Sequence, residues 1–294
     1  MQLPLQPALE QSLENKARKR EPAVSVGAIL LTLSALIITV LLLFPVYWMI
    51  VNSLETNQQI FSIPVTVVPT GITFNAYAST FADQLPHLLT SLLVSLGVVA
   101  VSLLIATPAA YALAHFRARF SNILIFSLLL AQMIPAVTLA TPMFLIFTKL
   151  GLLNSYPGLI LADSTYAVPF DVIIMAAFMQ ALPYELVESA FIDGAGEWRA
   201  FLRVMLPLAV PGVVTAGLFA FLFSWGDFLY GLTIMTTNDI QPISLSIYNY
   251  LGQYSSQWNN VMAVATLGAI PAAILLIAFQ RYITSGLTSG ALKG

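Results

Sequence analysis

The sequence predicts an all-α polytopic membrane protein with six transmembrane helices and with both termini in the cytoplasm. The 294-residue chain is 59% hydrophobic and 8% charged, with a mean hydropathy of +0.87. A soluble domain of this size could not bury so much apolar surface. The apolar runs are continuous and lack the period-two alternation of a membrane β-barrel. Finally, the six-span layout places nearly all Lys and Arg residues on the same side of the membrane.

The N-terminal part is predicted to be a cytoplasmic tail, a first span and an external loop. Residues 1–25 form the tail, and residues 26–50 form the span, which lacks a small-residue cleavage site and is expected to be retained rather than removed as a signal peptide. Residues 51–86 form the loop, in which extended chain is followed by a short helix capped near Thr73 or Asn75.

The second and third spans are predicted over residues 87–112 and 122–147. Pro135 and Pro142 fall inside the third span. Because proline lacks the N–H that a helix requires, these residues must kink this span or break its ladder of hydrogen bonds.

Three further spans complete one transmembrane domain over residues 26–283. The remaining segments are an outer turn at 149–156, a fourth span at 157–178 that carries Asp163 and Asp171, a cytoplasmic insert at 181–203, a fifth span at 204–229, an external loop at 231–260, a sixth span at 261–283 and a cytoplasmic tail at 284–294.

The positive-inside rule supports this layout. Of the eleven Lys and Arg residues, only Lys149 is placed outside. The other ten are placed in the cytoplasm: Lys16, Arg18, Lys19, Arg20, Arg117, Arg119, Arg199, Arg203, Arg281 and Lys293.

A polar, charge-bearing insert interrupts the apolar pattern between the fourth and fifth spans. Its first helix is predicted to begin at Glu185, with carboxylates at the positive end of the helix dipole. Gly194 can end that helix in the left-handed conformation. A second helix follows over residues 197–206, and Pro207 marks the entry to the fifth span. This helix-turn-helix is interpreted either as an amphipathic elbow at the headgroups or as a segment held by a partner.

The spacing within the insert resembles the cytoplasmic loop signature of ABC importer permeases, written E-A-A, three residues, G, nine residues, I-x-L-P. Here it reads Glu188-Ser189-Ala190, then Gly194, then Val204-x-Leu206-Pro207. Ser189 in place of Ala and Val204 in place of Ile are mild departures.

Four further motifs resemble the six-span permease of carbohydrate-uptake transporters of the maltose-transporter kind, and the match extends from Leu42 onward. Two departures occur, Gly226 where the fifth-span motif usually has Asn, and Thr90 where the second span usually has Asn. The four motifs are Pro69 with ITFNAY (72–77), AAYALAHFRARF (109–120), KLGLLNSYPGLIL (149–161) and QRYITSGLTSGALKG (280–294).

The resemblance implies a type I ABC importer permease fold in a bacterial or archaeal plasma membrane, importing an oligosaccharide or sugar derivative without enzymatic activity of its own. The implied partners are a second permease subunit in a heterodimer, two copies of a cytoplasmic ABC ATPase and an extracellular solute-binding protein. The chain sits in membrane lipid and has no nucleic-acid partner. It binds no cofactor, since ATP and Mg belong to the ATPase. The absence of cysteine and the presence of only two histidines also argue against a metal site.

The resemblance further implies two contacts with the ATPase. In the coupling loop, Glu188 would pair with a basic residue of the ATPase, Gly194 would permit the turn and Asp193 would support it. The candidates there are Glu185, Glu188, Ser189, Ala190, Asp193, Gly194, Ala195, Leu206 and Pro207. The C-terminal tail is the second contact, unless it is a frayed terminus. Its candidates are Thr288, Gly290, Lys293 and Gly294.

Ionisable and polar groups inside spans are candidates for a translocation path. The alternative is that they hydrogen-bond neighbouring helices and stabilise the bundle. The candidates are Gln132, Asp171, Trp225, Asp227 and Tyr230.

Two other classes of function compete with the permease. An intramembrane hydrolase would need a G-x-S-x-G, an H-E-x-x-H or a paired-Asp signature, and none is present. The sequence also lacks G-x-x-x-x-G-K-[ST], so it predicts no nucleotide bound by a P-loop. A secondary transporter driven by protons through Asp171 or Asp227 remains the alternative, and co-purification of an ATPase separates it from the permease.

Overall fold

The computed structural model describes residues 26–64, 67–69, 71–115, 121–253 and 257–291, with side chains up to Tyr282. The predicted N-terminal tail, the connection with Arg117 and Arg119, and Lys293 and Gly294 lie outside the described residues. The described elements are α2 (Val26–Ser53), α3 (Asn57–Ile60), α4 (Asn75–His115), α5 (Ser121–Gln132), α6 (Ala136–Leu150), α7 (Tyr156–Gln180), α8 (Glu185–Ile192), α9 (Glu197–Ala200), the π-helical turn η1 (Phe201–Met205), α10 (Leu206–Leu208), α11 (Val210–Gly226), α12 (Leu229–Ile234), α13 (Ile243–Gln253) and α14 (Trp258–Ala291).

The chain divides into two compact units, Met1–Ile50 and Val51–Gly294. The described part of the first unit is most of α2, which confirms the first predicted span. Two hydroxyl groups of this helix make hydrogen bonds within it: those of Thr32 and Thr39 donate to the backbone carbonyls of Ala28 and Ala35. Hydroxyls that bond to carbonyls of their own helix are compatible with a lipid environment.

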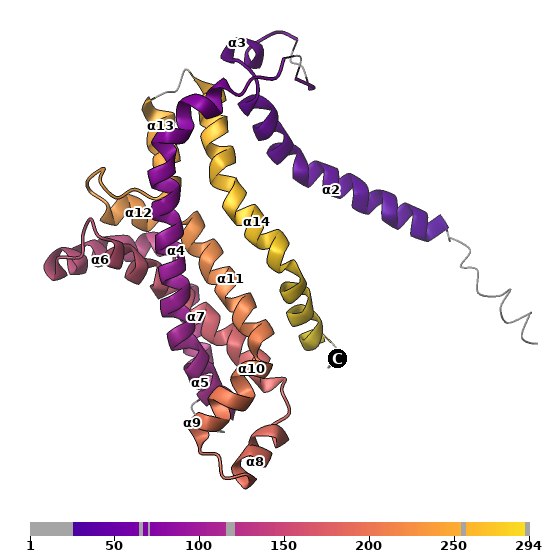
Figure 1. Cartoon of the computed structure of the whole chain (residues 1–294), viewed down its shortest axis with the longest axis vertical. Coiled ribbons are helices and arrows are strands. Elements are labelled where there is room, and N and C mark those ends of the chain that lie inside the picture. The colour runs from indigo at the N-terminus through magenta and orange to yellow at the C-terminus, as the bar shows by residue number, and fades with distance from the viewer. Residues whose placement is uncertain (1–25, 65–66, 70, 116–120, 254–256, 292–294) are drawn as a thin grey trace, which may run out of the picture. The chain divides into compact units, whose positions relative to one another are not determined.

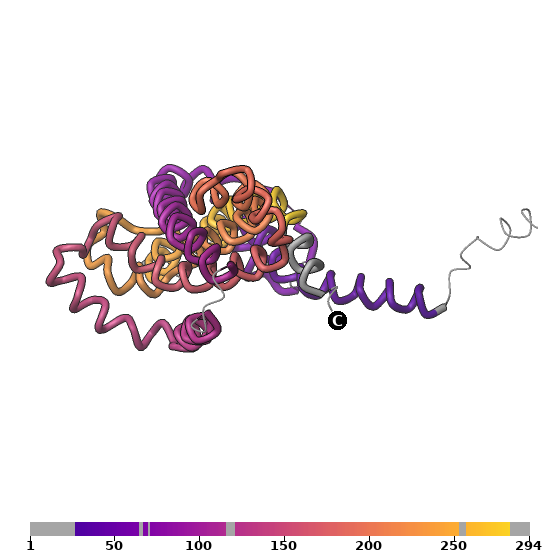
Figure 2. Tube along the Cα trace, turned by 90° about the horizontal axis from the view of Figure 1, so that it is seen from below, coloured from indigo at the N-terminus to yellow at the C-terminus, as the bar shows by residue number. Residues whose placement is uncertain are grey.

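The second unit is a helix bundle built on α4, α7, α11 and α14 (Figures 1 and 2). Helix α4 packs along α7 and α11, and α14 packs on α11 and α4. Glycine allows the helices to approach closely. A Cβ on Gly212 of α11 would lie 2.7 Å from Cγ of Phe178 on α7, and one on Gly97 of α4 would lie 2.5 Å from Cδ1 of Ile160. Such small-residue contacts are typical of helices packed in a membrane.

The predicted short helix and the second span are one continuous helix, so no break separates them at residue 87. Helix α4 begins at Asn75, whose N–H is bonded to Thr73 Oγ1 as expected, and passes through Pro86 and Pro108 to His115. Residues before Pro86 are buried at helical spacing, namely Ala76, Thr80 and Gln84. This packed stripe holds the helix together despite the hydrogen bond that Pro86 cannot make.

The third span is broken at Pro135, as predicted. Helices α5 and α6 meet at an angle of 92°, and Figure 2 shows α6 running sideways from the end of α5. Pro135 is in extended conformation and precedes α6, whereas Pro142 lies inside α6 without a break. Only one of the two prolines therefore reshapes the span.

The predicted fifth span, at 204–229, is also broken. Residues up to Leu208 belong to one arm, and α11 leaves it at an angle of 76°. Pro211 has no N–H to donate to the Pro207 carbonyl one turn earlier, and Ala209 between them departs from helical angles. At its far end α11 stops at Gly226 rather than at Leu229.

The predicted external loop at 231–260 contains α12 and α13. The candidate span Trp258–Tyr282 agrees closely with the predicted sixth span at 261–283. Helix α14 runs to Ala291, so the described part of the predicted tail is helical. Thr288 and Gly290 lie in this helix, but their side chains are outside the described part.

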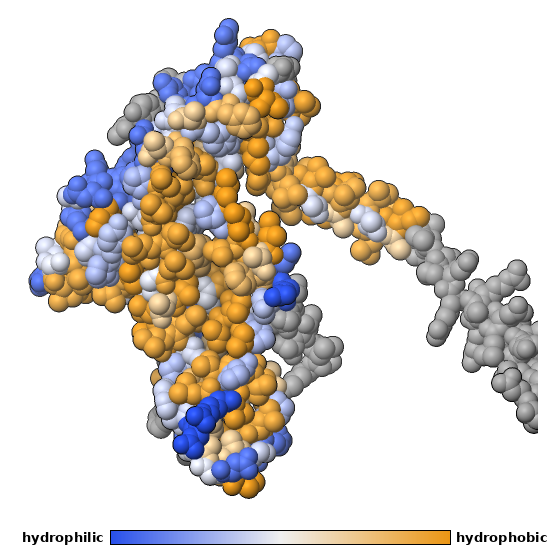
Figure 3. Space-filling view, in the orientation of Figure 1, coloured by the Kyte–Doolittle hydropathy of each residue, from blue (hydrophilic) through white to orange (hydrophobic). Residues whose placement is uncertain are grey.

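The described part of the chain has four helices that are long and apolar enough to cross a membrane, and up to six spans when each bent pair counts as one. Figure 3 shows apolar side chains covering the face of the bundle over α4 and α11. Hydrophilic side chains gather at the two ends, over α13 and the start of α4 and over α8 and α9. The all-helical, multi-span fold class is confirmed.

Candidate functional site

The polar insert forms an elbow, residues 185–208, at one end of the bundle. Its first helix, α8, carries Glu185 and Glu188 in the first turn, where the helix dipole favours negative charge. Gly194 follows with φ of +80°, and its N–H bonds the Phe191 carbonyl while the Ala195 N–H bonds the Ala190 carbonyl. The predicted helix start and the predicted left-handed glycine are confirmed.

The inner face of the elbow packs firmly on the ends of α4 and α7. Val187 and Ala200 are fully buried. The packed group comprises Tyr111, Met175, Met179, Val187, Ala200, Phe201 and Met205. The elbow therefore follows the bundle through a close-packed apolar contact, which transmits displacement rather than absorbing it.

Aromatic rings continue this contact from one arm of the elbow to the other. The ring centroids are 5.2 Å apart for Trp198 and Phe201, 5.0 Å for Phe201 and Tyr111, 4.6 Å for Tyr111 and His115, and 5.3 Å for His115 and Tyr184. These separations are within the range of favourable ring contacts. Both arms are thus tied to the same end of α4.

The outer face of the elbow is open. Ile192 is 87% exposed and Trp198 is 65% exposed, next to the exposed Glu188 and Asp193. Of the other predicted residues, Glu185, Ser189, Gly194 and Pro207 are exposed, and Ala190, Ala195 and Leu206 are partly buried. A groove of about 530 Å³ lies beside them, lined by Ala114, His115, Met179, Gln180, Leu182, Tyr184 and Glu188. Large apolar side chains exposed beside charges are typical of a protein-binding surface.

A small, partly open cavity lies where α7, α11, α12 and the start of α6 meet, and Phe223 in its lining is 37% exposed. Its volume is about 180 Å³, and its lining is Ala136, Asp163, Tyr166, Phe223, Asp227 and Tyr230. The cavity therefore combines three aromatic rings with two carboxylates, one on α7 and one in the connection between α11 and α12.

The two carboxylates are held differently. Asp163 accepts a hydrogen bond of 2.6 Å from the Ser224 hydroxyl through Oδ2, and its Oδ1 has no partner among the described residues. Asp227 accepts the backbone N–H groups of Tyr230 and Gly231, each at 3.1 Å, and so caps α12. The Ser244 hydroxyl donates to the Asp227 carbonyl and fixes α13 against the same corner.

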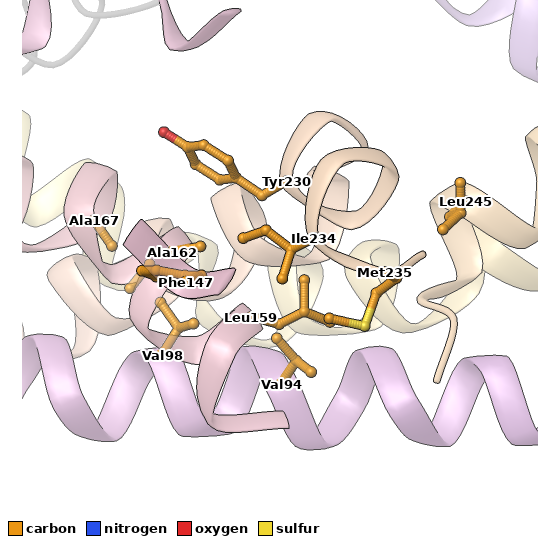
Figure 4. Close-up of a cluster of buried hydrophobic side chains, with 11 residues drawn as sticks. Val94, Val98, Phe147, Leu159, Ala162, Ala167, Tyr230, Ile234, Met235 and Leu245 are labelled. Atoms are coloured by element: carbon orange, nitrogen blue, oxygen red, sulfur yellow. The ribbon is translucent and has the colours of Figure 1, made fainter. Parts of the chain in front are cut away.

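An apolar cluster supports the cavity (Figure 4). Leu159 and Ala162 of α7 pack with Ile234 of α12 and with Val98 of α4. The Tyr230 ring lies at the edge of this cluster, and Figure 4 shows its hydroxyl directed away from the apolar side chains. The cluster fixes the positions of Asp163 and Tyr230 because both lie on helices that it joins.

The structure brings together two of the five predicted path residues, Asp227 and Tyr230, in this cavity. Gln132 is close by in the fold, since its side-chain amide donates to the Tyr166 carbonyl at 3.0 Å. Trp225 lies elsewhere, with its indole N–H bonded to the Gly268 carbonyl of α14 at 2.9 Å. Asp171 is fully buried and accepts a 2.5 Å hydrogen bond from Ser102 of α4.

Asp163 is the one charged residue among the four cavity residues that were not predicted as path residues, which are Ala136, Asp163, Tyr166 and Phe223. The available signal was its charge within a span, which makes any such residue a functional candidate. The spacing of residues along the sequence gave no further indication, because Ser224 and Asp227, which lie beside Asp163 in the fold, are far from it in the sequence.

Comparison with known protein families identifies the family of this chain. Residues 102–289 match the profile of the family described as "Binding-protein-dependent transport system inner membrane component". The chain belongs to this family. It is therefore an inner-membrane, multi-pass transport component, and its family assignment as an ABC importer permease is confirmed.

Individual members of the family are similar over most of the chain. The sulfoquinovosyl glycerol transport system permease SmoH of Agrobacterium fabrum is 35% identical over 86% of this chain and 89% of its own length. The trehalose transport system permease SugB of Mycobacterium tuberculosis is 34% identical over 86% of this chain and 93% of its own length. A chain of a bacterial ABC transporter that imports the acidic polysaccharide alginate shares the fold, with a TM-score of 0.74 and 20% identity, covering 89% of this chain and 98% of that one.

Proposed function

We propose that the chain is the permease subunit of a binding-protein-dependent ABC importer that moves a carbohydrate, an oligosaccharide or sugar derivative, across the plasma membrane. The relatives named for trehalose and for sulfoquinovosyl glycerol support a sugar as the transported solute. The observation that carries the proposal is the elbow, which packs on α4 and α7 through its inner face and exposes Ile192, Trp198 and Glu188 on the other.

The elbow suits a part that passes motion between two proteins. ATP binding closes two ATPase subunits, each moves an elbow, and the helices joined to that elbow swing between inward- and outward-facing states. Such a rigid displacement requires a contact that does not yield, which the buried Val187 and Phe201 provide. Glu188 would pair with a basic residue of the ATPase, and Gly194 keeps the turn sharp.

The remaining parts of the proposed transporter lie on other chains. A second permease subunit completes a heterodimer, two copies of a cytoplasmic ATPase bind ATP and Mg, and an extracellular solute-binding protein delivers the sugar. A solved alginate ABC transporter in complex with a pentasaccharide-bound periplasmic protein supports an assembly of this kind. This chain would bind no cofactor and catalyse no reaction.

A charge reversal at the elbow tests the proposal. In the complex reconstituted into vesicles, Glu188→Lys should reduce binding-protein-stimulated ATP hydrolysis and sugar uptake at least tenfold, because it places like charges at the contact. Glu197→Lys is the matched control, since Glu197 is an exposed elbow carboxylate outside the loop signature. Equal activity in the Glu188→Lys and wild-type complexes would contradict the proposed contact.

Proton-coupled secondary transport is the competing outcome. Purification of the tagged chain from its native membrane in mild detergent should recover an ATPase, a second permease and a binding protein. A chain that purifies alone, and whose uptake follows a proton gradient without ATP, would overturn the proposed function.

A further inference from the structure

The cavity between α7 and α11 has an unbalanced lining. Asp163 and Asp227 supply two carboxylates, Tyr166, Phe223 and Tyr230 supply rings, and none of the described residues of the lining is basic. Buried carboxylates in proteins are normally paired with cations or fully hydrogen-bonded. The described residues of this lining supply no cation, so the two carboxylates face whatever occupies the cavity.

Asp163 leaves a buried carboxylate oxygen of the lining without a partner in the described part of the chain. Its side chain is 94% buried, since only 6% of the residue is exposed. Ser224 satisfies Oδ2, while Oδ1 has no partner among the described residues. An unsatisfied buried acceptor is costly, and a ligand hydroxyl or ammonium group would satisfy it. Asp227 differs, because backbone N–H groups already occupy its oxygens.

The rings of the lining suit the apolar face of a sugar. Tyr166 contacts Phe223 edge-on, with ring centroids 6.1 Å apart, and Phe223 also contacts Phe170 at 5.0 Å. These contacts fix the Phe223 ring beside Asp163. The volume of about 180 Å³ corresponds to roughly six waters at their liquid volume, which is room for one ring and not for a chain of rings.

We propose that this cavity is a charge-selective subsite for a single sugar ring that offers hydrogen-bond donors and carries no anionic group. It would accept neutral or amino sugars and reject sugar acids, sugar phosphates and sulfonated sugars. Repulsion between an anion and two carboxylates at close range opposes binding of the anion, and the burial of Asp163 reduces screening of its charge by solvent. Asp163 binds the ring and Asp227 adds charge, so the pair determines specificity. The inference rests on the proposed function and narrows its substrate class.

The test compares three probes of one size on the purified full transporter in detergent. Methyl glucoside is neutral, glucosamine is cationic and glucuronate is anionic, and saturation-transfer NMR gives their dissociation constants. The wild-type complex should bind glucuronate at least tenfold more weakly than methyl glucoside. In Asp163→Asn this ratio should fall below about threefold, because the amide keeps the shape of the site and loses its charge.

Two variants make the test specific. Asp227→Asn should also weaken the rejection of glucuronate while keeping a side-chain acceptor for the α12 cap. Asp239→Asn removes an exposed carboxylate from the connection between α12 and α13, and it should leave the ratio unchanged. An equal change in Asp239→Asn would mean that overall charge, and not this cavity, sets the preference.

The wild-type measurement alone is decisive, so the inference does not depend on the folding of a variant. Equal binding of glucuronate and methyl glucoside overturns it, and so does failure to bind any of the three probes. ATP-driven uptake of trehalose in the same preparation would then leave the proposed function standing. Loss of ATP-dependent uptake of every sugar offered with its binding protein would overturn the function itself.

Discussion

Three carboxylates inside the membrane-spanning part of this protein show how the same residue type takes different roles. Asp171 is fully buried between α7 and α4 and accepts a hydrogen bond from Ser102. Asp227 caps α12. Asp163 alone combines deep burial, one open oxygen and a cavity. Asp171 also leaves Oδ1 without a partner among the described residues. Burial, charge and oxygen partners therefore do not separate Asp163 from Asp171; the position of Asp163 in the lining of the cavity does.

The hydrogen bond between Ser102 and Asp171 should contribute measurably to the free energy of unfolding. Ser102→Ala removes the only hydrogen bond that the structure gives to Asp171 within the described residues, so the free energy of unfolding should fall by about 1–3 kcal/mol. Ser127→Ala is the matched control, because its hydroxyl is exposed and bonds a carbonyl of its own helix. Thermal unfolding midpoints of the two purified variants in detergent decide the point. Equal midpoints would mean that the bond contributes nothing.

Two glycines share a left-handed backbone but differ in predicted role. Gly194 has φ of +80° and Gly151 has φ of +67°, and a Cβ on either would meet nothing within 4 Å. Alanine at each position should therefore cost about 1 kcal/mol of stability from backbone strain alone. Only Gly194→Ala should also lower coupled ATP hydrolysis, since only that turn shapes the elbow. The two variants are compared by thermal unfolding and by ATPase assay in vesicles.

At the scale of elements, local chemistry predicted where helices begin and break when a proline or glycine acted alone. The helix start at Glu185 and the break at Pro135 followed this rule. It failed at Pro86, because burial of Ala76, Thr80 and Gln84 holds α4 together across the proline. It also failed at Ala209, where the bend depends on two prolines one turn apart. Tertiary packing decides such cases, and a single sequence does not contain it explicitly.

The start of α7 depends on a close approach that only glycine allows. Ser155 caps the helix by accepting the Gly158 N–H at 3.1 Å, and its hydroxyl donates to the Leu152 carbonyl. A Cβ on Gly158 would lie 2.1 Å from that carbonyl oxygen. Gly158→Ala should therefore destabilise the protein by about 3 kcal/mol. Gly252→Ala in α13 meets nothing within 4 Å and should leave the unfolding midpoint unchanged or slightly raised.

At the scale of the whole molecule, the sequence predicted the class, the approximate spans and the family. Those properties follow from composition, from the distribution of charge and from motifs that are local in the chain. The cavity does not follow from such local features, because Asp163 and Ser224 lie 61 residues apart and meet only through the packing of α7 on α11. Trp225 shows the same limit, since its position beside Asp227 in sequence did not reveal that its indole faces α14.

The orientation in the membrane is a whole-molecule property that charge alone predicts, and the chain allows a clean measurement. Because it has no cysteine, any single cysteine variant carries one reactive thiol. Asp239→Cys, in an exposed outer connection, should react with a membrane-impermeant maleimide added to intact cells. Glu197→Cys, on the exposed elbow, should react only after the membrane is opened. Labelling of both from outside, or of the elbow alone, would reverse or abolish the predicted topology. It would also remove the elbow from reach of a cytoplasmic ATPase, so this orientation is a condition that the proposed coupling must satisfy.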